Sequence, residues 1–131
     1  MIYLINMQSS ITIEELRALE SPFPGRTFIS IYVPNAPINL ILNQIVSELN
    51  RTEKSTNWKV KGAVIMMLNQ LITYFQSLNS IPENGLVVFA VPKNQHEAII
   101  HHVLPEKNLI DLFFYVLDER FYLKDENFNF S

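Results

Sequence analysis

The sequence predicts an α+β fold in which helices pack on a mixed β-sheet and one helical hairpin projects from the body. Two helical apolar stripes occupy the middle of the chain, over residues 38–49 and 60–78. Apolar, β-branched and aromatic runs flank them at residues 27–33, 86–91, 98–104 and 112–117. The chain has 131 residues, of which 48% are hydrophobic and 18% charged. This composition suits a single folded domain over residues 1–131.

The first element is a short helix whose start is marked by Thr12. Glu15 follows this hydroxyl residue after three positions, which is the spacing of a capping box. We expect the helix to end near Ser21, because the next residue is proline. A proline-rich connector then leads into the strand of residues 27–33.

The middle of the chain predicts a helical hairpin. Pro37 suits the first turn of a helix whose apolar stripe runs to about residue 49. A second stripe starts at Val60, and the polar residues 50–57 between the stripes predict a short loop. Two helices joined in this way place residues 50–57 at a projecting tip.

The C-terminal third supplies most of the sheet. Pro82 and Gly85 predict a turn into residues 86–91, whose unbroken apolar run is typical of a strand covered on both faces. Three further segments are strand candidates: residues 98–104, 112–117 and 121–123. We expect residues 1–8 and 124–131 to be peripheral.

The composition excludes several kinds of chemistry. The chain has no cysteine, which removes disulfides, thiolate metal sites and cysteine nucleophiles. Its three glycines lie too far apart for a phosphate-binding loop. His101 and His102 on one strand would face opposite ways and share no metal. We therefore expect no enzyme, and neither catalytic residues, metal nor cofactor.

Charge and hydropathy limit the partners. No apolar run reaches membrane-spanning length, and the N-terminus lacks the basic lead of a secretion signal, so we expect a cytoplasmic protein without a membrane partner. The net charge of −3 argues against bulk attraction to nucleic acid and against DNA as a partner. Any RNA contact must be local. Arg51, Lys54, Lys59 and Lys61 form one local cationic cluster.

Two stretches carry a family resemblance. Residues 25–34, GRTFISIYVP, and residues 79–89, NSIPENGLVVF, resemble the N-terminal, stop-codon-reading domain of the eukaryotic and archaeal class-one peptide release factors. A helical hairpin lies between these stretches in that family too, and the similarity runs in order over about residues 11–123. The resemblance implies binding to the ribosomal decoding centre and mRNA, with other release-factor domains or subunits as further partners.

The resemblance also implies site residues at the hairpin tip. The family has Asn-Ile-Lys-Ser there, and one register places its last two residues on Lys54 and Ser55. A second register matches Asn57, Trp58 and Lys59 instead, keeping the asparagine and the lysine. Both registers stay open. Trp58 could stack on a base, although an aromatic residue here more often anchors a helix on the core.

Other family elements fall outside the tip. By resemblance, the family's Gly-Thr-Ser element falls on Gly25, Arg26 and Thr27, and its helix glutamate falls on Glu48. Its Tyr-x-Cys-x-x-x-Phe element falls on Tyr115, Leu117 and Phe121, with Leu117 in the cysteine position. From the residues alone, Glu48 is expected to pair with Arg51, and Tyr115 and Phe121 are ordinary core candidates. For the lysines of the tip, two interpretations are equally supported: contact with RNA, or simple exposure to solvent.

The departures from the family fall on the residues that read bases, so we expect altered or lost codon reading. The family's Gly-Gly-Gln domain, which promotes peptidyl-tRNA hydrolysis, has no counterpart in these residues. We therefore expect a codon-site-binding domain without hydrolytic activity of its own. The alternative hypothesis is a diverged protein-interaction module on the same fold.

Overall fold

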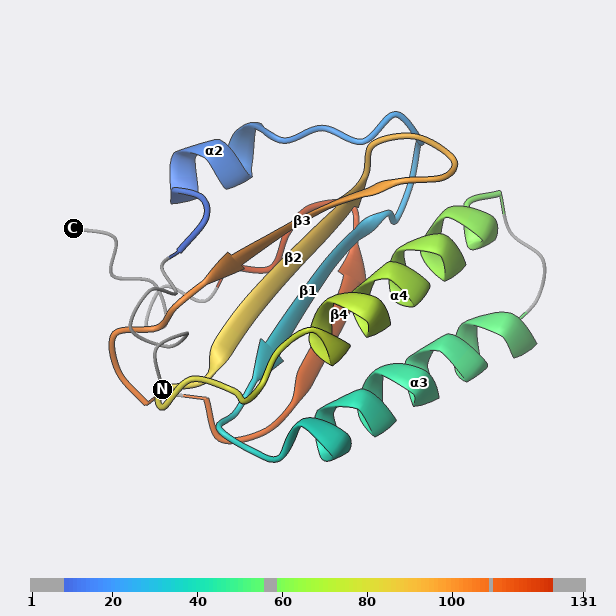
Figure 1. Ribbon diagram of the computed structural model, residues 1–131. Helices are drawn as coiled ribbons and strands as arrows, with labels where there is room; N and C mark the ends of the chain where they lie inside the picture. Colours follow the sequence, from blue (N-terminus) through green and yellow to red (C-terminus); the bar gives the residue numbers. More distant parts are fainter. Residues whose placement is uncertain (1–8, 56–58, 109, 124–131) are drawn as a thin grey trace.

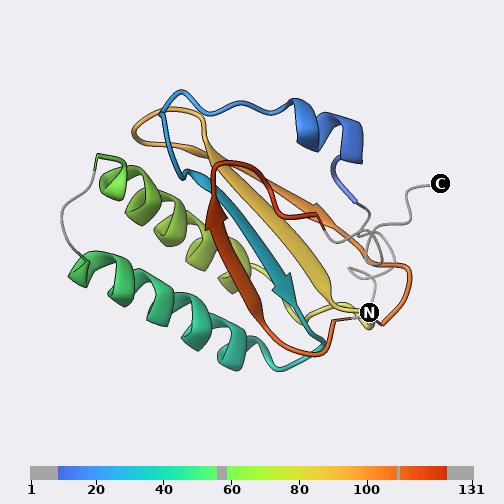
Figure 2. The same cartoon turned by 180° about the vertical axis from the view of Figure 1, so that it is seen from behind.

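Four strands form one antiparallel sheet that carries helices on both faces (Figure 1 and Figure 2). The computed structural model describes residues 9–55, 59–108 and 110–123. Its elements are, in chain order, α2 (Ile13–Ala18), β1 (Phe28–Val33), α3 (Ile38–Lys54), α4 (Lys61–Gln76), β2 (Leu86–Pro92), β3 (Ala98–Val103) and β4 (Phe114–Asp118). Within the described ranges, no helix is long and apolar enough to cross a bilayer. The predicted α+β class and helical hairpin are confirmed.

All strand pairs in the described residues are antiparallel, so the sheet is not of the mixed kind that the sequence suggested. The strand order is β3-β2-β1-β4. Between β1 and β2, α3 brings the chain back along the sheet and α4 returns it, which leaves β2 running opposite to β1 (Figure 1). Apolar patterning reports which face a residue occupies and carries no information about strand direction.

The sheet separates two apolar clusters. Neighbouring side chains of a strand point to opposite faces, so Ile31 and Val88 pack with α3 and α4, whereas Tyr32 and Phe89 pack with Leu16 of α2. All of β2 is buried, as its unbroken apolar run predicts. Truncating one of these large core side chains to alanine costs roughly 2–5 kcal/mol, so the clusters hold the layers together.

The capping box at the start of α2 is confirmed. Glu15 donates its backbone N–H to Thr12 Oγ1 at 3.2 Å, and Thr12 donates its own N–H to the Glu15 carboxylate at 3.0 Å. The backbone bond first, and then the bond from the Thr12 hydroxyl, hold the pKa of Glu15 below its usual value. The helix ends at Ala18 and not near Ser21, because Leu19 takes an extended conformation and packs on the α2-side cluster.

The first helix of the hairpin is longer than predicted. Residues 50–54, expected in the loop, continue α3 to Lys54. Arg51 donates to Glu48 one turn earlier at 2.9 Å, and this pair favours the added turn. Polar residues leave no apolar period, so the stripe could not show where the helix ends. Lys54 is therefore the last helical residue, and Ser55 is the C-cap.

Residues 121–123 do not form the additional strand for which they were a candidate. Side chains of β1 hold this segment instead. Tyr122 donates its N–H to Ser30 Oγ at 2.9 Å, and the Tyr32 hydroxyl donates to the Tyr122 carbonyl at 2.6 Å. Because these side chains satisfy the Tyr122 backbone, the segment packs on the sheet without extending it.

The two ends of the sheet differ in the segments that they carry (Figure 1). The hairpin end comprises residues 24–28, 51–55, 59–61, 92–98 and 117–118. The loop end comprises residues 33–38, 76–86, 103–108 and 110–114. Most of the sequence-predicted site residues belong to the hairpin end.

Candidate functional site

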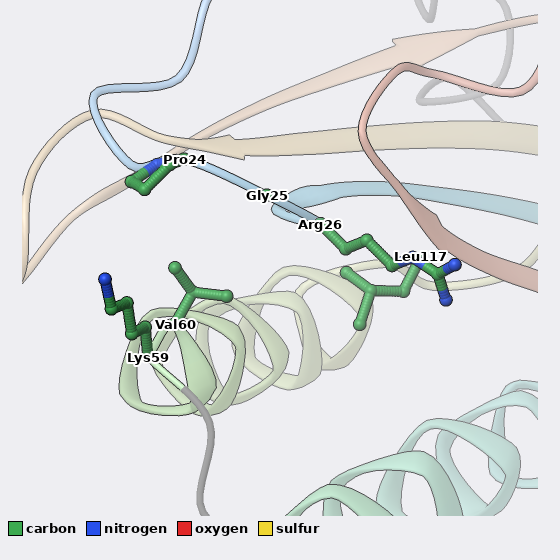
Figure 3. Close-up of a pocket in the computed structure, with 6 residues that line it drawn as sticks. All are labelled: Pro24, Gly25, Arg26, Lys59, Val60 and Leu117. Atoms are coloured by element: carbon green, nitrogen blue, oxygen red, sulfur yellow. The ribbon is translucent and has the colours of Figure 1, made fainter.

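A pocket of about 540 Å³ opens at the hairpin end, where the start of β1, the start of α4 and the end of β4 meet. It is lined by Pro24, Gly25, Arg26, Lys59, Val60 and Leu117 (Figure 3). Three of these were predicted site residues, and Leu117 occupies the cysteine position of the resemblance. The structure thus brings together residues from both ends of the sequence.

The pocket has an apolar floor and cationic sides. Val60 is buried at 7% exposure and faces the same space as the partly buried Leu117. Figure 3 shows the Lys59 side chain beside Val60 and the Arg26 side chain beside Leu117. Both cations are exposed, and within residues 9–55, 59–108 and 110–123 neither has an ion pair or hydrogen bond. Such a site suits a flat apolar group that carries negative charge nearby.

A tight backbone turn delivers Arg26 to this pocket. Gly25 has φ +88°, which L side chains rarely adopt, and a Cβ placed there would meet nothing within 4 Å. The glycine is therefore required by its backbone conformation and not by lack of space. Immediately afterwards, Thr27 is fully buried and donates its hydroxyl to Ser21 Oγ at 2.7 Å, which fastens the turn.

The cationic cluster predicted at the tip divides into bound and unbound members. Lys61 donates to the carbonyls of Glu53 and Ser55, each at 2.9 Å, and so caps the C-terminus of α3. Arg51 is bound to a glutamate on its own helix. Lys54 and Lys59 are exposed and have no ion pair in the part of the chain that the structure describes. These two lysines remain available to an external anion.

The start of α4 adds partial positive charge beside the pocket. Val60 precedes Lys61 as N-cap residue and supplies no side-chain acceptor, and the first turn contains no acidic residue. The first N–H groups of a helix lack intrahelical acceptors and attract anions. The helix terminus and Lys59 therefore both attract an anion to the pocket.

Glu48 of α3 and Tyr115 of β4 lie near each other, outside the lining of the pocket. Arg51 Nη1 donates to both carboxylate oxygens of Glu48, at 2.9 and 3.0 Å, so the ion pair expected from the sequence is present. The Tyr115 hydroxyl is buried and has no hydrogen-bond partner among the described residues. Burial, and to a lesser extent the Glu48 carboxylate, raise the pKa of Tyr115 well above its usual value. Tyr115 is thus a neutral donor held near a carboxylate.

Two predicted site residues, Phe121 and Thr27, lie outside the lining of the pocket. Phe121 packs edge-to-face on Phe28 and Phe89, with ring centroids 4.9 and 5.1 Å away, on the face of α2. It therefore lies across the sheet from Tyr115, which packs on the hairpin side. Thr27 is buried in its turn. Trp58 and Asn57 of the second tip register lie outside the described residues, whereas Lys59 of that register is described.

Sequence reasoning missed two of the pocket residues. Pro24 was interpreted only as a connector, although it directly precedes the predicted site residue Gly25. Val60 was assigned to the apolar stripe of its helix, and it does close the core while forming the pocket floor. A residue that begins a helical stripe can serve both roles, because it lies at the edge of the packed face.

Comparisons with known proteins bear on the family and the fold of the chain. The family model described as eRF1 domain 1 matches residues 7–127. A solved structure titled an archaeal protein matches with 25% identity and a TM-score of 0.70, covering 84% of this chain and 31% of its own. The crystal structure of the archaeal translation termination factor aRF1 matches with 25% identity and a TM-score of 0.66, covering 84% of this chain and 30% of its own. No curated protein matches.

The chain therefore spans about a third of the length of the two solved proteins it matches. The family model covers nearly all of the sequence, including the hairpin and every strand. The match to the archaeal factor extends the agreement to the fold. This chain belongs to the eRF1 domain 1 family, the N-terminal domain of the translation termination factors.

Proposed function

We propose that this domain binds the decoding site of the ribosome at an mRNA stop codon and does not itself hydrolyse peptidyl-tRNA. The observation that carries the proposal is the pocket at the hairpin end, in which unpaired cations border an apolar floor. Ribosome involvement follows from the release-factor family. The pocket supplies the surface through which RNA would be held.

Phosphates would be held by the cations of this end. Lys54, Lys59 and Arg26 project from three different segments, so they can follow a bent backbone, which a single helix face could not do. Lysine and arginine contacts to phosphate position a protein on RNA without regard to base sequence. The binding should therefore weaken steeply as salt is raised.

Bases would meet the apolar floor of the pocket and, beyond its lining, the Glu48 carboxylate of α3. Leu117 and Val60 offer flat contact to the face of a base but no donor or acceptor. Glu48 can accept a hydrogen bond from a base amino group, although Arg51 now occupies both of its oxygens. Edge recognition thus competes with an existing ion pair, which supports weak discrimination between codons.

The absence of hydrolysis is proposed from the residue types of the pocket. Its described lining consists of proline, glycine, arginine, lysine, valine and leucine, none of which is a general base at neutral pH in this setting. Nearby, Glu48 is bound to Arg51, and the raised pKa of Tyr115 keeps its hydroxyl protonated. These groups bind and position, and none of them activates water.

The test of this function is release of labelled peptide from archaeal ribosomes stalled at a stop codon. The chain alone should release none, and when titrated against a full-length termination factor it should slow release by competing for the site. Low salt should strengthen the competition. Peptide release by the chain alone would overturn the hydrolysis part, and lack of competition at low salt would overturn the binding part.

Codon discrimination is tested separately with ribosomes programmed with each stop codon and with a sense codon. Since Leu117 carries no hydrogen-bonding group, affinities should differ little among them. A preference of about tenfold or more for a stop codon, roughly 1.4 kcal/mol, would show that the remaining residues suffice for base reading.

A further inference from the structure

The two edges of the sheet are protected unequally. Along β3, Ser10 donates its N–H to the His102 carbonyl at 3.0 Å, and its hydroxyl accepts from the His102 N–H at 2.9 Å. Ser9 Oγ accepts the N–H of Leu104 at 2.8 Å. The N-terminal segment therefore covers this edge and occupies backbone groups that would otherwise face solvent.

Among the described residues, nothing gives the opposite edge, β4, such cover. It pairs with β1 through Phe28 to Tyr32, and no hydrogen bond joins its outer side to any described segment. In a strand, alternate residues direct their N–H and C=O groups away from the paired neighbour. β4 consequently presents unpaired donors and acceptors in the geometry that another strand requires.

Apolar side chains stand beside this open edge. Leu112, just before β4, is 78% exposed, and Phe114 and Tyr122 are 43% and 38% exposed. Ring contacts at 5.4 Å between Phe114 and Tyr122, and at 6.2 Å between Phe114 and Tyr32, hold the aromatic pair in place. We call Leu112, Phe114 and Tyr122 the β4 patch. Its members are three of the five large apolar side chains that are exposed among the described residues.

The charges around the β4 patch define the complementary partner. Asp111, Asp118, Glu119 and Arg120 are all exposed at the two ends of the strand, and the exposed Arg26 lies beside Leu117, so three acids stand against two bases, for a net charge of −1. Pairing of two copies through β4 would bring two such acidic edges together, which like-charge repulsion disfavours. A segment with lysine or arginine at its ends would instead meet opposite charge.

We propose that β4 is a docking edge for an extended basic segment of another protein, which adds a fifth strand to the sheet. The incoming backbone bonds to β4, one of its apolar side chains covers Phe114 and Leu112, and its basic residues face Asp111 and Asp118. The β4 patch lies toward the loop end, and the RNA pocket lies at the hairpin end. The two adjoin at the end of β4, where Leu117 lines the pocket next to Asp118, but the docking proposal does not rest on the proposed codon-site function.

The test uses three synthetic peptides. The first is Lys-Lys-Val-Thr-Val-Thr-Lys-Lys, the second replaces its lysines with glutamate, and the third is the first with alternate backbone nitrogens methylated. Amide hydrogen exchange of the whole chain is followed by NMR. The lysine peptide should slow exchange across residues 114–118 by at least about tenfold at saturation, and the other two should not.

Charge reversal sharpens the result. Asp111→Lys should lower the affinity for the lysine peptide by about fivefold, as expected for the loss of one exposed ion pair. Leu112→Lys should block strand addition. Glu83→Lys, an exposed acid in the turn before β2, is the matched control and should change nothing. Both positions on the docking side are exposed, so the variants should melt as the parent does.

Four outcomes would overturn the proposal. These are no binding of the lysine peptide at about 1 mM, equal binding of the methylated peptide, protection that spares residues 114–118, or equal loss of affinity in Glu83→Lys. Sedimentation that shows a dimer disrupted by Leu112→Lys would assign the edge to a second copy of this chain instead. Protection of residues 114–118 that depends on Asp111 would support the proposal.

Discussion

The loop end and the hairpin end of the sheet use their polar residues in opposite ways. At the loop end, side chains bind the backbone of neighbouring loops. Asn35 donates to the carbonyls of Ile81 and Pro82 at 3.0 and 3.1 Å, and Asn84 donates to those of Pro105 and Glu106 at 3.3 and 2.9 Å. These amides fasten three connections to one another.

At the hairpin end, several polar side chains point outward without a partner. Lys54, Lys59 and Arg26 have no ion pair in the described ranges, and Lys59 and Arg26 border a pocket with an apolar floor. Lys61 is the contrasting case, since it caps α3. The loop end therefore supports stability, and the hairpin end is available for binding. Substitutions at the two ends should therefore separate these properties.

The largest expected effect comes from one glycine at each end. Gly85 has φ +90°, and a Cβ there would lie 2.5 Å from the Val33 carbonyl oxygen. Gly85→Ala should destabilise the fold by about 3 kcal/mol, from strain and from a clash with backbone. Gly25→Ala shares the positive φ but meets nothing within 4 Å, so it should cost only about 1 kcal/mol. Equal losses in urea unfolding would contradict the comparison.

Loss of a loop clamp should have the next largest effect. Asn84→Ala removes both hydrogen bonds to the 105–106 carbonyls and should cost about 1–2 kcal/mol of unfolding free energy. Thermal melting followed by circular dichroism measures this. Binding to ribosomes should be retained at temperatures well below the melting point. A stable Asn84→Ala protein with impaired binding would place function at the loop end.

An alkaline titration gives a smaller effect. Burial raises the pKa of Tyr74, near the loop end of α4, to about 12 from its usual 10. Because the folded pKa is the higher one, the folded state holds this proton longer. The stabilisation is full below pH 10 and is lost as the pH rises toward 12.

Tyr74→Phe removes this ionisable group and should flatten the fall in stability. The difference from the parent should be about 1 kcal/mol at pH 11. At neutral pH the substitution should be nearly neutral, since the Tyr74 hydroxyl has no partner among the described residues. Urea unfolding at pH 7 and pH 11 measures both values, and an unchanged pH dependence would show that Tyr74 ionises as an exposed tyrosine does.

The smallest effect on stability should come from the cations of the hairpin end. Lys54→Ala and Lys59→Ala remove exposed side chains that have no ion pair in the described ranges, so each should change the unfolding free energy by less than about 0.5 kcal/mol. Lys61→Ala should cost more, about 1 kcal/mol, because it uncaps α3. If all three behave alike in urea unfolding, the division of the cluster is wrong.

Much of this fold could be predicted from the sequence because its signals are local. The Thr12–Glu15 capping box, the two helical stripes and the buried run of β2 each act over a few residues. Whether two strands run parallel or antiparallel depends on how many times the chain runs along the sheet between them. No local sequence pattern records this number. The end of α3 was also invisible, since polar residues 50–54 suit a helix and a loop equally well.

Part of the candidate site could be predicted, because short motifs carry the family resemblance. Gly25, Arg26 and Lys59 were identified by resemblance and converge at the pocket, while Phe121 turned out to lie on the other face. The chain leaves β4 at Asp118 and crosses to the α2 side before Phe121, so spacing along the sequence does not carry over to the face of the sheet. The role of each residue in RNA binding stays a prediction.

The most direct test of the central claim measures binding to stop-codon-programmed archaeal ribosomes over a range of salt. Lys59→Ala is compared with Lys107→Ala, since Lys107 is also an exposed lysine but lies near the loop end. We predict that Lys59→Ala lowers affinity by about fivefold to tenfold and makes the salt dependence shallower by nearly one ion, whereas Lys107→Ala changes neither. Equal effects of the two substitutions, or no effect of Lys59→Ala, would contradict an RNA-binding site at the hairpin end.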